Sequence, residues 1–349
     1  MLKPILERGI ADLNFDESAI RQLESWELAD GKRAQALGIS PENVRSQIDR
    51  RCDLFLATLD RCQHFSIASH PAFYDNLWTL WLPLAIQLAD DRRALGRPFV
   101  QGVLGGQGMG KTTLATMLEA ILAQLGYRTI GLSIDDLYKT HAERQRLKAK
   151  DPRFIRRGPP GTHDIELGID VLDRLRQPDG AEPIAIPRFD KSLWNGDGDR
   201  SQPETIESVD IILFEGWFVG AQPVDPATFD NPPNPILTEA DKSFARTVNE
   251  QLRDYLPLWE RIDRLMVLNP TDYRLSLPWR RQAEHSAIAQ GKTGMTDLEI
   301  DEFVKYFWKS LHPDLFIAPL TQNGNLVDLV VTVNADRTFG QIYRPERNQ

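Results

Sequence analysis

The sequence has few cysteines and no long hydrophobic run. Only two cysteines, Cys52 and Cys62, occur among 349 residues, and their spacing fits neither a metal site nor a disulfide framework. We therefore expect buried or unreactive thiols in a reducing compartment. No stretch reaches the apolar length needed to span a bilayer, so we expect no membrane partner.

The sequence also lacks a cluster of basic residues. Its formal net charge is −9, whereas nucleic-acid binding draws on grouped Lys and Arg, so we expect no nucleic-acid partner. The first residues contain acids early and no apolar segment like that of a signal peptide, which favours a cytoplasmic location. No internal repeat is present.

The pattern of apolar residues divides the chain into two parts. Residues 1–97 show helical periodicity without strand signals. This part is predicted to be a helical N-terminal extension that either packs on the remaining chain or forms a contact in a homo-oligomer. Residues 98–349 alternate strands and helices, which is typical of a doubly wound parallel α/β sheet with helices on both faces.

Continuous apolar segments predict the strands of this second part. Strands are expected over 99–104, 128–133, 184–186, 209–214, 262–268 and 326–333, and helices over 165–175 and 240–259. Two stretches have no regular pattern. Residues 187–205 are predicted to form a functional loop, and residues 220–235 a surface insertion.

A glycine-rich loop follows the first predicted strand. Residues 105–112, GGQGMGKT, fit the pattern G-x-x-x-x-G-K-[S/T] and precede a predicted helix. This arrangement directs backbone N–H groups toward phosphate oxygens, with Lys111 on the β- and γ-phosphates and Thr112 on Mg²⁺. The motif predicts a site for ATP or another nucleoside triphosphate. Its expected members are Gly105, Gly106, Gln107, Gly108, Met109, Gly110, Lys111, Thr112 and Thr113.

Acidic residues follow two of the other predicted strands. Asp135 and Asp136 come after the second strand, and Glu215 comes after the strand over 209–214. Ligands of open α/β sheets bind at the carboxyl ends of strands. Phosphoryl transfer to an alcohol needs a carboxylate that accepts the hydroxyl proton, and Mg²⁺ to spread charge. Asp135 is the predicted base and a metal ligand, and Glu215 completes the Mg²⁺ shell. Asp136 competes for either role or caps a helix.

Two loop segments contain cations suited to an acidic substrate. Arg157 lies in RRGPPGTHD, and Arg188 and Lys191 lie in PRFDKS. Arginine can bind a carboxylate or phosphate through two parallel hydrogen bonds. Asp190 would orient these cations or bind hydroxyl groups, and His163 is compatible with a structural role or with substrate contact. A solvated loop is the alternative for both segments.

A third cationic segment lies beyond residue 268. Arg280 and Arg281 are on a predicted helix, and Lys292 follows in GKTGM. Phosphotransferases commonly cover the transferring phosphate with a mobile cationic lid. The segment is therefore predicted to be a lid, with a solvated helix face as the alternative.

These motifs together resemble a known group of kinases. SIDDLY after the second strand and FEG after a later strand resemble the superfamily of uridine kinase, pantothenate kinase and phosphoribulokinase. RGPPGTHD, PRFDKS, FEGWFVG, WRRQAEH and GKTGMTD are similar, in this order, to D-glycerate 3-kinases of the plant and cyanobacterial type. The resemblance covers about residues 98–315. It implies a P-loop kinase domain over 98–349 with a lid region.

The resemblance also implies an activity. We expect ATP-dependent phosphorylation of D-glycerate at the 3-hydroxyl, giving 3-phosphoglycerate and ADP, at the end of the photorespiratory glycolate pathway. The implied catalytic residues are Lys111, Asp135 and Glu215. Substrate-binding residues are expected among Asp136, Tyr138, Arg157, His163, Arg188, Asp190, Lys191 and Arg280. The alternatives are a kinase for another small hydroxylated metabolite and an ATP-binding regulatory protein.

Overall fold

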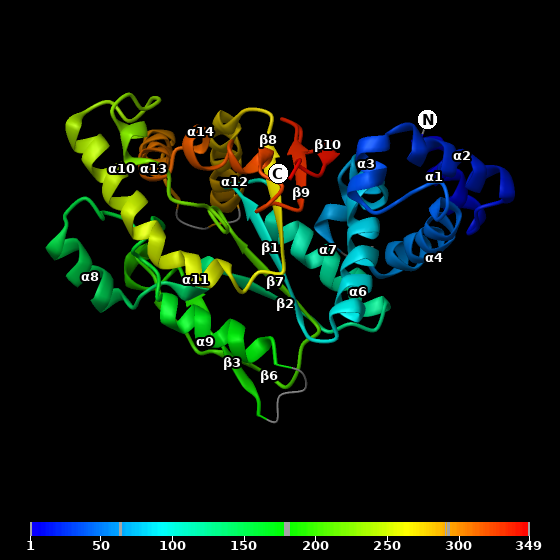
Figure 1. Ribbon diagram of the computed structural model, residues 1–349, viewed down its shortest axis with the longest axis horizontal. Coiled ribbons are helices and arrows are strands. Elements are labelled where there is room, and N and C mark those ends of the chain that lie inside the picture. The colour runs from blue at the N-terminus through cyan, green and yellow to red at the C-terminus, as the bar shows by residue number, and fades with distance from the viewer. Residues whose placement is uncertain (1, 63–64, 178–181, 290, 292–293, 348–349) are drawn as a thin grey trace.

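A six-stranded sheet forms the centre of the protein (Figure 1). The structure, a computed structural model, describes residues 2–62, 65–177, 182–289, 291 and 294–347. The strand order is β10-β9-β8-β1-β7-β2. The strands are β1 (Phe99–Gly105), β2 (Thr129–Ser133), β7 (Ile211–Gly216), β8 (Arg264–Pro270), β9 (Leu329–Val333) and β10 (Phe339–Tyr343). All neighbours pair in parallel except β10, which is antiparallel to β9. The predicted α/β fold is confirmed.

The two faces of the sheet belong to two separate cores. Along β1, Phe99 and Val103 join one core and Val100 and Leu104 join the other, because successive side chains of a strand point to opposite faces. Both faces are covered, which explains the nearly continuous apolar runs of the strands. The first core includes α7 (Lys111–Gln124). The second includes α9 (Ile165–Leu175), α10 (Glu239–Gln251), α11 (Leu256–Trp259) and α13 (Asp297–Ser310).

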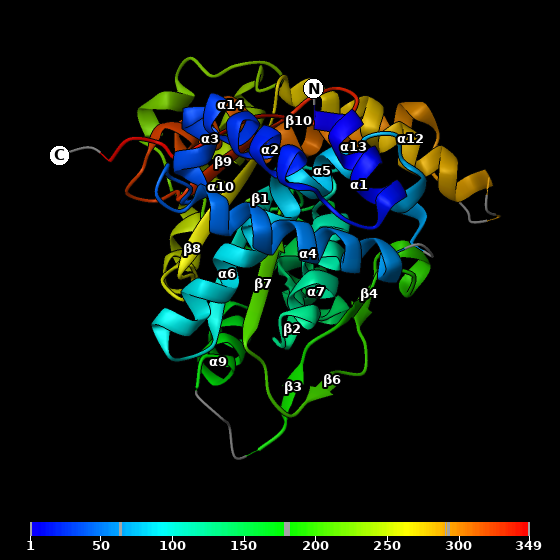
Figure 2. The same ribbon diagram turned by 90° about the vertical axis from the view of Figure 1, so that its right-hand side faces the viewer.

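The N-terminal helices pack on the face of the sheet that carries α7 (Figure 2). Ile48, Phe55 and Trp78 are fully buried in the core shared with α7 and β1, so this segment covers the sheet as a helical layer. Leu28 lies outside this core and is 37% exposed. The helices are α1 (Leu2–Asp12), α2 (Glu17–Ala29), α3 (Gly31–Ala36), α4 (Val44–Cys62), α5 (Phe73–Asn76) and α6 (Leu82–Leu95), with a π-helical segment over Leu77–Trp81.

Both cysteines are buried and free in this helical part. Burial raises the pKa of the Cys52 thiol to about 12 and also raises that of Cys62. A thiol with a raised pKa has little nucleophilic thiolate at neutral pH. The prediction of buried or unreactive thiols is confirmed as to burial at both positions.

The predicted helix over 240–259 is wrong as a single helix. α10 ends at Gln251, a 3₁₀ turn follows over Leu252–Tyr255, and α11 begins at Leu256. Pro257 lacks an N–H and is tolerated in the first turn of a helix, so a new helix starts beside it. The apolar periodicity continued through the break because Phe244, Val248, Leu252 and Tyr255 are all buried in one core.

Several short elements were missed because they are too short to show a period. The segment over 187–205 is not wholly irregular. Its β4 (Phe189–Asp190) pairs with β5 (Asp199–Arg200), and β6 (Glu204–Ile206) pairs with β3 (Ile184–Ile186). The edge strand β10 was also not predicted. The remaining α-helices are α8 (His141–Lys150), α12 (Ser276–Ala289) and α14 (Pro313–Phe316). Within the described ranges, no helix is both long and apolar enough to cross a bilayer.

Candidate active site

The glycine-rich loop lies at the carboxyl end of β1, in the middle of the sheet. Gly108 and Gly110 have φ angles of +77° and +83°, which other residues rarely adopt. A Cβ atom on Gly108 would also lie 2.6 Å from Cβ of Trp279. The helix α7 begins directly after the loop at Lys111, and Thr112 is exposed at this helix end with Thr113 beside it. The loop thus presents a helix N-terminus suited to an anion.

The Lys111 side chain folds back over the loop. Its Nζ atom donates to the backbone oxygens of Gly105 and Gly106 at 2.7 and 3.2 Å. It also lies 3.7 Å from Oε2 of Glu215, at the end of β7. The strand register places Glu215 beside Val103 of β1 and Ser133 of β2. A cation and a carboxylate therefore meet at the loop, where Mg²⁺ and phosphate would need them.

Gln107 and Met109, which we call the outer rim of the loop, have a different environment from Lys111. The Sδ atom of Met109 accepts a hydrogen bond from the N–H of Gly106 at 3.1 Å. The Oε1 atom of Gln107 is buried and has no hydrogen-bond partner among the described residues. Met109 is buried and Gln107 is half-buried, in contrast to the exposed Gly108 and Thr112.

Asp135 accepts hydrogen bonds on both of its carboxylate oxygens. The Tyr138 hydroxyl donates to Oδ1 at 2.7 Å, and the Lys191 ammonium donates to Oδ2 at 2.6 Å. Burial acts to raise the pKa of Asp135, but the charge and hydrogen bond of Lys191, together with the Tyr138 hydroxyl, outweigh it and lower that pKa. Asp135 is ionised at neutral pH, as a proton acceptor must be.

The carboxylate of Asp136 is hydrogen-bonded to other groups of the protein. It accepts hydrogen bonds from the backbone N–H groups of Ser133 and Phe189 at 3.1 and 3.3 Å, and from Arg188 at 3.1 Å. Burial raises its pKa despite these partners. The N–H of Ser133 and the carboxylate of Asp136 form half of a capping box on the turn that follows β2. The capping alternative therefore matches the observed contacts of Asp136.

Arg188 and Asp190 also have protein partners. Arg188 bonds the backbone oxygen of Gly131 at 3.0 Å and Oε2 of Glu204 at 2.6 Å, in addition to Asp136. Asp190 accepts from the N–H and hydroxyl of Ser192 at 2.8 and 2.6 Å. Both side chains thus shape the segment that carries Lys191, whose own side chain is 58% exposed.

Arg157 and Arg144 hold the turn between β4 and β5. Arg157 donates to the backbone oxygens of Gly196 and Asp197 at 2.6 and 3.0 Å. Arg144 donates to those of Asp197 and Gly198 at 2.7 and 2.6 Å. Arg144 was not predicted as a site residue, because nothing in the sequence of α8 distinguishes it from the nearby Arg146.

Tyr138 and His163 lie together beneath Asp135. Their rings stack with centroids 4.5 Å apart, and both residues are buried. The Nδ1 atom of His163 is 2.7 Å from the Tyr255 hydroxyl, which also accepts from the N–H of Gly161. Burial lowers the pKa of His163 to about 3, so its ring is neutral at physiological pH. Burial and the Asp135 charge raise the pKa of Tyr138, so its hydroxyl stays a donor.

The predicted lid cations are paired along α12 and α13. Arg280 forms an ion pair with Glu284 at 2.7 Å, and its guanidinium lies over the ring of Phe303. Arg281 pairs with Asp301 of α13. Lys292 lies outside the described residues. The structure therefore brings Lys111, Glu215, Asp135 and Lys191 to the carboxyl edge of the sheet and gives Arg280 and Arg281 local partners.

The predicted Mg²⁺ ligands are hydroxyl and carboxylate groups at the ends of neighbouring elements. Thr112 is exposed at the start of α7, Glu215 lies beside Lys111, and Asp135 follows β2, the neighbour of β7. No group of three or more His, Cys, Asp or Glu side chains suited to a metal occurs among the residues with described positions. Mg²⁺ commonly binds one or two carboxylates plus phosphate oxygens and water, so these residues fit a metal that arrives with a nucleotide.

Known proteins that are similar to this chain are kinases. No family model matches the sequence. The chain is 34% identical over 220 residues to the uncharacterized kinase mug58 of Schizosaccharomyces pombe, a match that covers 61% of this chain and 79% of that protein. It is 28% identical over 352 residues to the chloroplastic D-glycerate 3-kinase of Arabidopsis thaliana, covering 92% of this chain and 72% of the relative.

A solved structure is similar to this chain in fold as well as in sequence. The D-glycerate 3-kinase of Cryptococcus neoformans var. grubii superposes with a TM-score of 0.66 at 28% identity, over 74% of this chain and 95% of that one. The loop sequence, the sheet topology and the identity to mug58 agree with one another. The chain therefore belongs to the family of P-loop kinases that includes these D-glycerate 3-kinases.

Proposed function

We propose that the protein transfers the γ-phosphoryl group of ATP to the 3-hydroxyl of D-glycerate, giving 3-phosphoglycerate and ADP. The observation that carries the proposal is the pair formed by Asp135 and Lys191 at 2.6 Å, at the sheet edge that also holds Lys111 and Glu215. It supplies a base for a hydroxyl and a cation for a carboxylate at one place. The names of the Arabidopsis and Cryptococcus relatives support the same substrate.

ATP and Mg²⁺ are the proposed cofactors. The loop over 105–113 would hold the phosphates through its N–H groups and Lys111. Thr112, Glu215 and Asp135 would hold Mg²⁺, which would spread the negative charge that develops on the transferring group. This assignment is consistent with the exposed Thr112 and with the position of Glu215 beside Lys111.

Asp135 is proposed to accept the proton of the glycerate 3-hydroxyl. The hydroxyl oxygen forms a bond to the γ-phosphorus, the bond from that phosphorus to the β–γ bridging oxygen breaks, and ADP leaves with the electron pair. Tyr138 would orient Asp135 through its hydrogen bond to Oδ1. The lowered pKa keeps Asp135 ionised before the proton arrives.

Lys191 is the proposed partner of the glycerate carboxylate. It is exposed and its described contact is with Asp135, whereas Arg157 and Arg188 already donate to several protein oxygens. An acidic acceptor would therefore draw the Lys191 ammonium toward itself and leave the Asp135 oxygen free for the hydroxyl. Arg280 would approach the phosphates from α12.

A role in the photorespiratory glycolate pathway and a cytoplasmic location remain predictions, and the Arabidopsis relative is named as a chloroplastic enzyme. The division of the chain at residue 97 is likewise proposed, with the helices before it as a layer on the kinase domain.

The test is ADP release from the purified protein with Mg²⁺ and ATP, with and without D-glycerate, followed by identification of the product. Strong stimulation with 3-phosphoglycerate as the product is the expected result. Stimulation by another hydroxylated acid and not by glycerate would move the assignment to that acid. Slow ADP release that no acceptor changes would contradict a kinase of small acids.

A further inference from the structure

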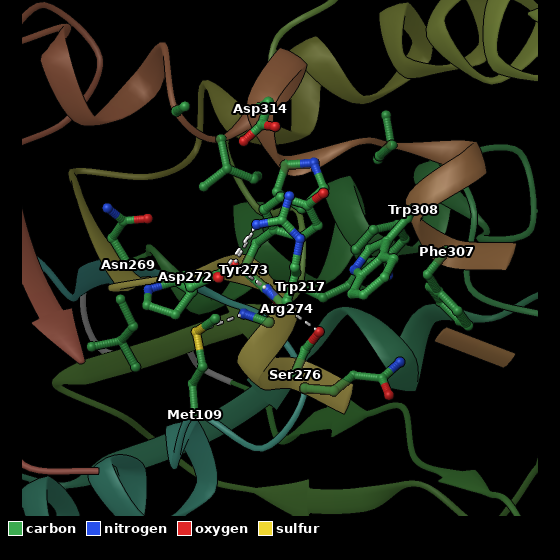
Figure 3. Close-up of a pocket in the computed structure, with 18 of the residues that line it drawn as sticks. Met109, Trp217, Asn269, Asp272, Tyr273, Arg274, Ser276, Phe307, Trp308 and Asp314 are labelled. Carbon is green, nitrogen blue, oxygen red and sulfur yellow. Dashed lines mark hydrogen bonds and ion pairs between the residues drawn. The ribbon is translucent and has the colours of Figure 1, made fainter. Parts of the chain in front are cut away.

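A cavity of about 460 Å³ lies behind the outer rim of the P-loop (Figure 3). Its walls come from the loop, the end of β8, the first turn of α12, and the helices α13 and α14. We call it the rear cavity. Trp217, Phe307 and Trp308 give it aromatic walls, and Gln107 and Met109 form its boundary with the loop. Glycerate, with three carbons, is far too small to fill such a volume.

The rear cavity shares part of the phosphate loop with the proposed phosphoryl-transfer site. Its lining includes Gly106, Gln107 and Met109, and the residues that line it do not include Lys111, Thr112, Asp135 or Lys191. The indole of Trp217 is fixed between the two regions. Its Nε1 atom donates to the backbone oxygen of Gly158 at 3.2 Å, and its ring packs edge-on against Phe307 at 5.0 Å.

The polar groups of the rear cavity disfavour an anion. Asp272 and Arg274 pair with each other at 3.3 Å, so their charges offset one another. Asp314 is 55% exposed, and its near neighbour His312 is buried and uncharged because burial lowers its pKa. Asp314 therefore leaves a net negative charge at the rim. The unpartnered Oε1 of Gln107 adds a hydrogen-bond acceptor on the loop side.

We propose that the rear cavity binds a planar aromatic molecule that is neutral or singly cationic and carries an N–H or O–H donor. The aromatic walls would stack on the ring, Gln107 would accept from the donor, and Asp314 would favour a positive charge. Such a ligand would touch Met109, which holds the N–H of Gly106 within the phosphate loop. Occupancy would therefore change the affinity of the loop for nucleotide.

The test is calorimetric titration of the full-length protein with three probes of one shape: tryptamine, indole and indole-3-acetate. We expect saturable binding of tryptamine and indole, with indole-3-acetate about tenfold weaker than tryptamine. Two variants fill the cavity: Ala318→Trp from its exposed edge and Val304→Phe from within. Both should abolish binding, whereas Lys305→Trp, on the exposed side of α13, should retain it.

Several results would overturn the proposal: no saturable binding of any probe, tightest binding of the anion, or unchanged binding in both filled variants. Competitive displacement of tryptamine by adenosine, which has no phosphates to bind the loop, would assign the cavity to the nucleoside of ATP and would also overturn the proposal. Binding is measured without turnover. A failure of this proposal is therefore distinguishable from a failure of the proposed kinase reaction.

Discussion

The ammonium of Lys191 lies 2.6 Å from the carboxylate of Asp135, although the two residues are 56 positions apart in the chain. The short segment between β4 and β5 brings them together, and Asp136 and Arg188 anchor that segment to the end of β2. The pair joins a proton acceptor to a mobile cation. Substitution of either residue should therefore change the reaction in its own way.

Asp135→Asn should remove turnover while ATP binding remains largely intact. An amide keeps the shape of the side chain and cannot accept the hydroxyl proton, so we expect kcat to fall by about 10²- to 10⁴-fold. Steady-state kinetics and nucleotide titration measure the two effects separately. Glu166→Gln, an exposed carboxylate on α9, is the matched control. Rates like those of the unmodified protein in Asp135→Asn would remove Asp135 from its role as base.

Lys191→Met should raise KM for glycerate and alter the pH profile. Lys191 lowers the pKa of Asp135, so without it the burial of that carboxylate would raise the pKa. The base of the free enzyme would then become protonated at a higher pH, and the acidic limb of kcat/KM against pH should move upward. Lys148→Met on the exposed face of α8 is the control. An unchanged KM together with an unchanged acidic limb would show that Lys191 serves neither function.

Gly108→Ala should weaken nucleotide binding and lower stability. The added Cβ would meet Trp279 at 2.6 Å, and the residue would keep an unfavourable φ of +77°. We expect a cost of about 1–3 kcal/mol in the free energy of unfolding. Urea unfolding and ATP titration give the two values. Gly31→Ala, where no atom lies within 4 Å of the added Cβ, should be nearly neutral. Equal stability of the two variants would contradict the close contact with Trp279.

The buried neutral His163 should make the protein acid-sensitive. Its pKa is about 3 in the folded state and 6.5 in a free side chain. The unfolded chain therefore takes up the proton first as the pH falls below 6.5, and stability is lost from there toward pH 3. At pH 5 we expect a loss of about 2 kcal/mol relative to pH 7.5 from this residue.

The measurement is urea unfolding of the unmodified protein and of His163→Phe at both pH values. The variant should lose less stability on acidification than the unmodified protein does. His285→Gln, an exposed histidine, should keep the full pH dependence. An identical pH dependence in all three proteins would mean that His163 is not buried as a neutral ring.

Much of the fold could be predicted because its signals are local. The buried strands β1, β7 and β8 contain long apolar stretches, and a stretch covered on both faces is visible without knowledge of its neighbours. Helix α9 was predicted with both of its ends because Asp164 caps its first turn. The break after Gln251 was missed because burial of one apolar stripe continues across it.

The candidate site likewise has features that the sequence predicts and features that it does not. The sequence alone determined the phosphate loop and its Lys111, since contiguous residues between a strand and a helix make that motif. It also determined that acids follow β2 and β7, at the carboxyl edge of a parallel sheet. It predicted Asp135 as the base but left Asp136 as a competitor for either role, because the two acids are adjacent and the sequence does not show where their side chains point.

Only the tertiary structure shows that the two acids have different partners, with Arg188 and the N–H of Phe189 on Asp136 and Lys191 on Asp135. It also set Trp279 against Gly108 and closed α13 and α14 over the rear cavity. Each of these contacts joins segments that are distant along the chain. The packing of the strands and helices decides which residues meet, and that packing depends on the whole sequence.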